Sequence, residues 1–136
     1  MLNIWSDPPP IDVRAPEPAL LVEGHQLWLA YRTRRQDHFA VLLFSGLVRL
    51  SFGRPGDDTL SGHPLLAAGL EPCRFSELTR GNMAMGADRD EARSGVRRWM
   101  APFHDDLLDV QATTAQVVVR AVEAPDAPGA LAAIRA

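Results

Sequence analysis

Three short runs of strand-forming sequence follow one another closely in the first half of the chain, and they constrain the fold more than any other feature. Residues 26–32 are rich in aromatic and aliphatic side chains, residues 38–44 are almost continuously apolar, and residues 47–52 alternate between apolar and polar. The connections are short, and Ser45-Gly46 is a typical tight-turn sequence. Strands joined in this way pair as antiparallel neighbours, so the region predicts a β-meander.

The second half of the chain adds further strand-like runs. Residues 96–103 and 116–122 are rich in aromatic or β-branched side chains, and residues 107–112 alternate. The sequence therefore predicts a mainly β fold, with α+β as the alternative, whose antiparallel strands form a barrel or a sandwich that protects their edges. One or two short helices are expected between residues 64 and 94. The predicted core comprises Trp28, Leu29, Phe39, Val41, Leu43, Val48, Leu50, Phe52, Phe75, Trp99, Phe103, Leu108, Val110, Val117 and Val119.

Length and local composition predict one domain with a flanking segment at each end. A chain of 136 residues suits a single domain that buries roughly two-thirds of its unfolded surface. Residues 1–18 contain five of the eleven prolines, so we expect a loose leader that contributes little to the core. The β-rich domain is expected at residues 19–124. Residues 125–136 are Ala-rich and are expected to form a weakly helical, peripheral tail.

Charge and residue usage exclude several classes of function. The net charge of −3 argues against a nucleic-acid partner, because phosphate binding needs a basic surface. All fourteen basic residues are arginine, which excludes Schiff-base chemistry and a P-loop lysine. Cys73 is the only cysteine, so the chain has neither an internal disulfide nor a thiolate zinc cluster.

The N-terminal sequence and the apolar runs bear on localisation. The early carboxylates and prolines are unlike a signal peptide, and the longest apolar run, residues 39–44, is far too short to span a bilayer. We therefore expect a cytoplasmic protein without a membrane partner. A homodimer remains one option for its assembly.

Two polar motifs, Gly62-His63-Pro64-Leu65 and Phe103-His104-Asp105-Asp106, stand out in the otherwise apolar sequence. An imidazole has an ordinary pKa near about 6.5, so His104 and His63 are candidate catalytic acids or bases. Neighbouring strand residues face opposite ways, so Asp105 is poorly placed to orient His104, and Glu77 is the candidate carboxylate for that task. The alternative is that both motifs are ordinary turns whose polar groups bind backbone.

The candidate ligand-binding residues are Arg97, Arg98, Trp99 and Asp105. Arg97 and Arg98 are adjacent in one predicted strand, so one of them faces inward and could anchor a carboxylate or a phosphate. His63, His104 and a carboxylate could together bind a metal, but no His-x-His or His-x-x-x-His spacing supports such a site. The sequence therefore predicts no metal and no cofactor.

Residues 52–112 resemble a family of small, uncharacterised bacterial proteins. The shared features are a Phe-Gly-x-Pro-like loop, Gly-His-Pro-Leu, Gly-Leu, an aromatic-x-Glu segment and Phe-His-Asp. In this chain they occupy residues 52–55, 62–65, 69–70, 75–77 and 103–105. The chain departs from the family at residues 78–81, where Leu-Thr-Arg-Gly stands in place of a polar stretch containing Trp. The resemblance implies a shared fold and no particular reaction.

Two functions from different classes remain open at this point. The first is a small-molecule pocket lined by His63, His104, Glu77 and an inward-facing arginine, used for acid–base catalysis or for binding alone. The second is a non-catalytic protein-interaction module that works through a sheet face or the Pro-rich leader. Convergence of the two imidazoles in one cavity would favour the first.

Overall fold

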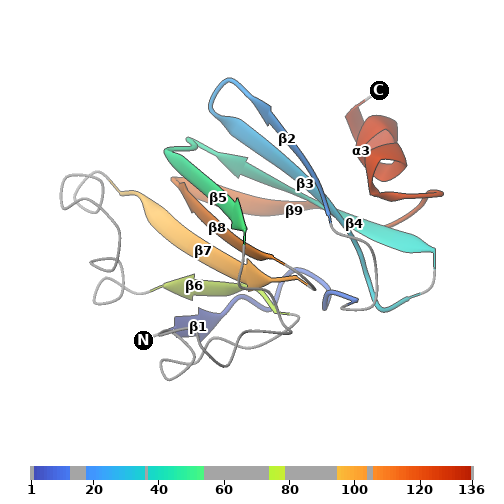
Figure 1. Cartoon of the computed structure of the whole chain (residues 1–136), viewed down its shortest axis with the longest axis horizontal. Helices are drawn as coiled ribbons and strands as arrows, with labels where there is room; N and C mark the ends of the chain where they lie inside the picture. The colour runs from blue at the N-terminus through green and yellow to red at the C-terminus, as the bar shows by residue number, and fades with distance from the viewer. Residues whose placement is uncertain are drawn as a thin grey trace.

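In the part of the chain that the structure describes, two antiparallel β-sheets form the body and one short helix packs on the outside (Figure 1). A computed structural model of the chain describes residues 2–12, 18–35, 37–53, 74–78, 95–103 and 106–135. In spatial order, the five-stranded sheet contains β1 (Leu2–Ile4), β6 (Ser76–Leu78), β7 (Arg97–Pro102), β8 (Leu107–Ala112) and β5 (Arg49–Gly53). The four-stranded sheet contains β2 (Ala19–Glu23), β3 (Gln26–Arg32), β4 (His38–Ser45) and β9 (Thr114–Glu123). Helix α3 (Ala127–Arg135) follows β9.

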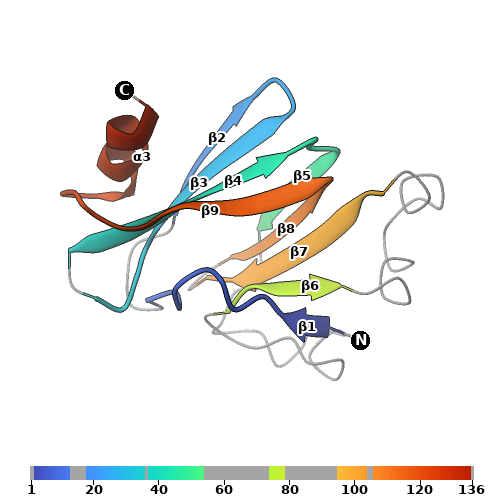
Figure 2. The same ribbon diagram turned by 180° about the vertical axis from the view of Figure 1, so that it is seen from behind.

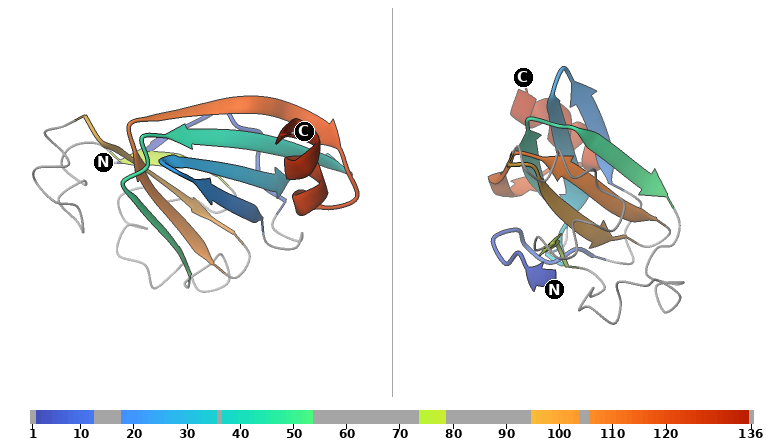
Figure 3. Two further views of the ribbon diagram at one scale, coloured as in Figure 1. Left: turned by 90° about the horizontal axis from the view of Figure 1, so that it is seen from above. Right: turned by 90° about the vertical axis from the view of Figure 1, so that its left-hand side faces the viewer.

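The two sheets lie against each other at an angle, as Figure 3 shows from two directions. All neighbouring strands pair antiparallel. Strands β2, β3 and β4 form a meander. The sequence had suggested that β5 continues this meander after β4, but β5 pairs with β8 in the other sheet. Within the described residues the sheets do not close into a barrel. The predicted mainly β fold is confirmed in its sandwich form.

The chain changes sheets at a corner between Ser45 and Thr113. The Thr113 backbone N–H and its Oγ1 both donate to the Ser45 carbonyl oxygen, at 3.0 and 2.9 Å. Gly46 has a φ of +69°, and a Cβ at this position would lie 2.1 Å from Thr113 Oγ1. Any other residue would therefore be strained and would collide with the corner. This glycine lets β4 bend into β5 while β8 bends into β9.

The space between the sheets is filled by aromatic and aliphatic side chains. Trp99 lies at the centre of an aromatic group, with ring centroids 5.5 Å from Phe44 and 6.1 Å from Trp5. Most of the predicted core is confirmed as buried or packed against buried residues. Val48 is the exception, because it is 43% exposed next to the sheet-changing corner. Buried members of this inner core include Leu27, Leu29, Tyr31, Leu42, Phe75, Phe103, Leu108 and Val110.

Helix α3 covers the outer face of the four-stranded sheet (Figures 1 and 2). Ala127, Ala130 and Leu131 of the helix pack on Phe39 and Val41. Strand β4 is therefore buried on both faces, which explains its continuous apolar sequence. The tail is helical as expected, and it lies on the outside of the molecule while burying Ala127, Ala130 and Leu131 against the sheet.

The Pro-rich leader is part of the packed structure. Strand β1 pairs with β6, and Ile11 is 2% exposed within the inner core. The Tyr31 hydroxyl donates to the Pro9 carbonyl oxygen at 2.7 Å, and Trp5 contacts the aromatic group. The expectation of a loose leader with little core contribution is therefore wrong for residues 2–12. The prolines restrict the segment without preventing single apolar side chains from packing.

Some expected features lie beyond the residues that the structure describes. The short helices predicted between residues 64 and 94 fall almost entirely in that category, since only residues 74–78 of that range are described. Among the described helices none has the length and apolar character needed to span a membrane.

Candidate functional site

A polar hollow of about 450 Å³ lies on the outer face of the five-stranded sheet, at its β5 edge. We call it the β5–β8 hollow. Its lining combines the exposed Val48 side chain with charged, hydroxyl and amide groups on the strands, whereas the Leu50 side chain packs against the inner core. The lining residues are Val48, Arg49, Leu50, Ser51, Asp109 and Gln111.

Strand register brings the polar groups of this site together. Arg98 of β7 stands opposite Gln111 of β8, which in turn stands opposite Arg49 of β5. The adjacent row sets Asp109 opposite Ser51. Because side chains alternate along a strand, all five residues belong to the face opposite the inner core. The sheet therefore gathers polar groups from three strands that are far apart in sequence.

A buried ion pair lies beside the hollow. Arg98 Nε donates to Asp109 Oδ1 at 2.8 Å, and Arg98 Nη2 donates to Asp109 Oδ2 at 2.6 Å. The Arg98 side chain is only 8% exposed and that of Asp109 is 20% exposed. Such a two-pronged pair fixes both groups and offsets much of the desolvation of the guanidinium. Asp109 thus presents a fixed carboxylate to the hollow.

Gln111 supplies an unsatisfied hydrogen-bond acceptor. Its side chain lines the hollow, the residue is 4% exposed, and no donor from the described residues reaches its Oε1 atom. A buried acceptor without a donor costs about 1–3 kcal/mol. The Oε1 atom is itself enclosed, with less than 1 Å² of accessible surface, so its missing donor is a cost within the fold.

Arg97 and Glu77, two of the predicted site residues, form an ion pair on the opposite face of the five-stranded sheet. Arg97 Nε donates to Glu77 Oε2 at 3.0 Å, and Arg97 Nη2 donates to Glu77 Oε1 at 2.5 Å. The hydrogen bond with Glu77 raises the pKa of the Arg97 guanidinium. Its carbon centre lies 4.8 Å from the Trp99 ring, so the pair covers the end of the inner core. Trp99 itself is 1% exposed and packs in that core.

These contacts bear on the predicted role of Glu77. Both carboxylate oxygens already accept hydrogen bonds from Arg97, so an imidazole would have to share that group. His63, His104 and Asp105 lie outside the described residues, and their convergence with Glu77 stays a prediction. Of the predicted ligand-binding arginines, Arg98 is the one beside the hollow.

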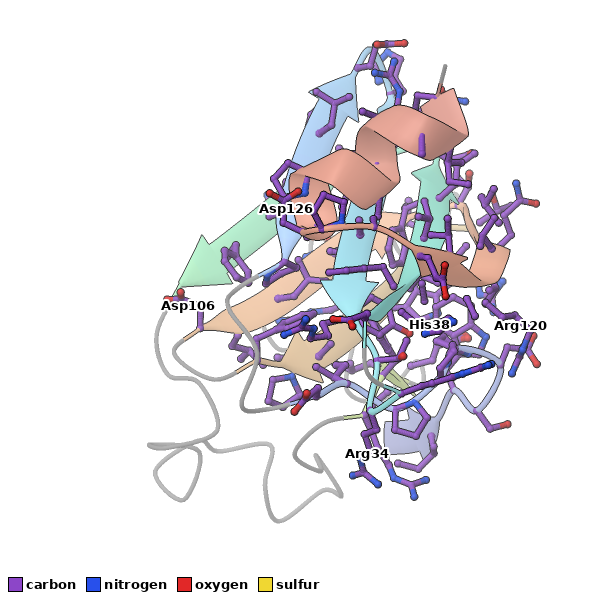
Figure 4. All side chains as sticks on the ribbon, turned by 90° about the vertical axis from the view of Figure 1, so that its right-hand side faces the viewer. Arg34, His38, Asp106, Arg120 and Asp126 are labelled. Carbon is purple, nitrogen blue, oxygen red and sulfur yellow. The ribbon has the colours of Figure 1, made fainter. Side chains whose placement is uncertain are left out.

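The remaining described histidine near charged groups is His38. Figure 4 labels it where β4 runs beside β9, and its Nε2 lies 3.8 Å from Glu123 Oε1. Arg34, also labelled there, extends from the β3–β4 connection. The described part of the chain contains no group of three histidine, cysteine or carboxylate side chains able to hold a metal ion.

Sequence reasoning missed four residues of the hollow: Arg49, Ser51, Asp109 and Gln111. A signal for them existed, because they are the polar positions of the two alternating runs at residues 47–52 and 107–112. Alternation normally indicates a solvent-facing side, and nothing local indicated that the two runs pair with each other.

Comparison with known proteins adds no assignment: no protein-family model, no curated protein and no solved structure matches the chain.

Proposed function

We propose that this protein binds a small polar molecule in the β5–β8 hollow. The observation that carries the proposal is the concave group of polar residues beside the fixed Arg98–Asp109 pair. A concave site with a few oriented polar groups is the usual form of a small-molecule site. Its volume of about 450 Å³ is within the range of such sites.

The groups of the hollow divide into orienting and contacting roles. Arg98 holds Asp109 in place, and Ser51 and Asp109 offer hydrogen bonds to the bound molecule. Val48 supplies apolar contact at the rim. None of these roles requires a chemical step, so the proposal is one of binding. Acid–base catalysis by His104 and His63 is its catalytic extension, which requires their imidazoles to reach the same hollow.

A blocking substitution tests the proposal. Ser51→Trp fills the hollow, whereas Gln116→Trp, on the edge strand of the other sheet, adds the same ring at an exposed position away from it. We would screen small amides, carboxylates, amines and sugars by two-dimensional ¹⁵N NMR of the backbone amides. Shifts at residues 48–51 and 109–111 are expected in the wild type and in Gln116→Trp, and their loss is expected in Ser51→Trp.

Two outcomes would contradict this assignment. One is a compound that shifts the same amides equally in Ser51→Trp, because then the hollow is not the site. The other is a screen in which no compound shifts the lining amides, which would favour the non-catalytic interaction module. Melting temperatures of both Trp variants establish that each is folded.

A further inference from the structure

We propose that the β3–β4 connection is a docking site for an acidic peptide segment of a partner protein. The side chains that carry it are those of Arg34 and Arg35 in the connection and Arg120 of β9, which we call the arginine patch. All three residues are exposed, and none of them forms a hydrogen bond or an ion pair with the described residues. The patch belongs to the four-stranded sheet, whereas the β5–β8 hollow belongs to the other sheet, so the two sites are independent.

The turn that carries Arg34 and Arg35 is held by several backbone contacts. Thr33 is 4% exposed, and both its N–H and its hydroxyl donate to the His38 carbonyl oxygen, at 3.0 and 3.1 Å. The His38 N–H donates to the Arg35 carbonyl oxygen at 3.2 Å, and Thr33 forms an isolated bridge with Ile11. A fixed backbone loses less conformational freedom on binding, so the two arginines are presented to a partner at low entropic cost.

Arg120 lies at the same end of the four-stranded sheet. The strand register sets residues 120 and 121 beside Ala40 of β4, and Ala40 stands opposite Tyr31, two residues before Thr33. Burial raises the pKa of Tyr31, and the positive charge of Arg120 opposes this in part, as a guanidinium near the ring should. A third exposed cation therefore lies on the strand beside the hairpin.

Carboxylates of the fold already bind other arginines. Next to the patch, Arg32 Nη2 donates to Asp37 Oδ1 at 3.2 Å. Three further arginines also donate to carboxylates: Arg97, Arg98 and Arg135. The arginine patch keeps the same planar sets of N–H donors, which match carboxylates in pairs. Carboxylates supplied by another molecule are therefore the groups that complement it.

The charges around the patch favour a short acidic segment over a broad anionic surface. Asp37 and Glu123 lie near the patch with side chains that are 67% and 82% exposed, and the chain carries a net charge of −3. A DNA duplex or an anionic membrane covers a wide area and meets these negative charges as well. A single phosphate ion gains little from solvated arginines. A peptide with several carboxylates reaches more than one guanidinium and avoids the flanking acids.

Hexaglutamate, with hexaglutamine as its uncharged control, tests the proposal. Binding would be followed by ¹⁵N NMR titration of the full chain, through the backbone amides of residues 33–35 and 38. Hexaglutamate is expected to shift these amides in the wild type, and hexaglutamine is not. Raising NaCl from about 20 to about 200 mM is expected to weaken the binding at least about fivefold, because salt screens exposed charges.

Two double variants of equal net charge separate the patch from the overall charge. Arg34→Gln with Arg35→Gln removes two positive charges from the patch. Gln26→Glu with Gln116→Glu adds two negative charges at exposed positions toward the sheet-changing corner, at the other end of the four-stranded sheet. The affinity for hexaglutamate is expected to fall at least about fivefold in the first variant and no more than about twofold in the second.

Several outcomes would overturn the proposal. One is the absence of shifts at residues 33–35 when hexaglutamate is added to the wild type, and another is an equal affinity of the two double variants. Inorganic phosphate, a short DNA duplex and phosphatidylserine vesicles are titrated alongside, and tighter binding of any of them through the same amides would overturn the acidic-peptide class. If the double glutamine variant does not fold, Arg34→Gln alone takes its place, with an expected loss of at least about twofold.

Discussion

Arg97 and Arg98 are neighbours in sequence, and each binds a carboxylate through two hydrogen bonds, yet they lie on opposite faces of β7 in very different surroundings. The Arg97–Glu77 side chains are 49% and 29% exposed, whereas the Arg98–Asp109 side chains are 8% and 20% exposed. Exposed pairs contribute little to stability, because water solvates the separated charges well. A buried pair is costly to form and more costly to break, since the remaining charge is left without a partner. The same kind of arginine–carboxylate pair is therefore expected to affect stability very differently on the two faces of β7.

The largest expected effect comes from breaking the buried pair. Asp109→Ala leaves the Arg98 guanidinium in its buried position without its carboxylate, and we expect a loss of about 3–5 kcal/mol in the free energy of unfolding. Urea denaturation followed by fluorescence measures this loss.

A double variant controls for packing. Replacing both partners, as Arg98→Met with Asp109→Leu, is expected to recover most of the lost stability, because no charge remains buried. If Asp109→Ala costs less than about 1 kcal/mol, the pair behaves like a surface pair and the contrast between the two faces disappears.

The second-largest expected change in stability concerns another buried polar group, the Tyr31 hydroxyl that donates to the Pro9 carbonyl oxygen. Burial raises the pKa of Tyr31 above its ordinary value of 10.0, with Arg120 opposing this in part. The folded state therefore keeps the proton that the unfolded state releases. Stability from this group is fully present below about pH 10 and falls as the pH rises above it, by up to about 1.4 kcal/mol per pH unit.

This chain is well suited to that measurement. Tyr31 is its only tyrosine and it has no lysine, so few other side chains titrate near pH 10. Tyr31→Phe is expected to lower the free energy of unfolding by about 1 kcal/mol at pH 7, because the hydrogen bond is lost. The free energy of unfolding of this variant is expected to depend less on pH between about 9.5 and 11 than that of the wild type. Equal pH slopes for the two proteins in urea denaturation would show that the hydroxyl ionises freely in the fold.

The sequence predicts those parts of the fold that depend on contacts between residues close together in the chain. Alternation and turn residues predicted strands and an antiparallel β fold, because both depend on neighbours in the chain. The pairing of β5 with β8 joins residues 49–53 to residues 107–111, and no local pattern indicates it. The burial of Ile11 was missed for a similar reason, since its partners, such as Thr33 across an isolated bridge, are distant in sequence.

The site shows the same limit more sharply. One of two adjacent arginines was expected to face inward, but the buried one, Arg98, faces the outer side of its sheet and takes its partner from β8. Asp109 and Gln111 occupy the polar positions of an alternating strand, which local reasoning assigns to solvent. Only the register across three strands shows that they meet beside a hollow.

A smaller loss of stability is expected from breaking the exposed Arg97–Glu77 pair. Glu77→Ala removes the partner of Arg97, and the guanidinium remains in contact with water and with the Trp99 ring. We expect a loss of no more than about 1 kcal/mol, which 0.5 M NaCl should reduce further because salt screens exposed charges. A loss as large as that of Asp109→Ala would show that this pair is part of the core.

The smallest expected effect belongs to Gln111→Leu. The Oε1 atom of Gln111 receives no donor from the described residues, so its removal takes away an unmet polar group from a buried position. Leucine has nearly the same volume and suits that burial. The free energy of unfolding is therefore expected to stay within about 1 kcal/mol of the wild type, with a gain more consistent with the argument than a loss. Thermal and urea unfolding of the ligand-free protein measure it, with Gln116→Leu as the exposed control. A loss above about 2 kcal/mol would mean that Gln111 supports the fold through a contact of its own, and its Oε1 atom would then not be an unmet acceptor.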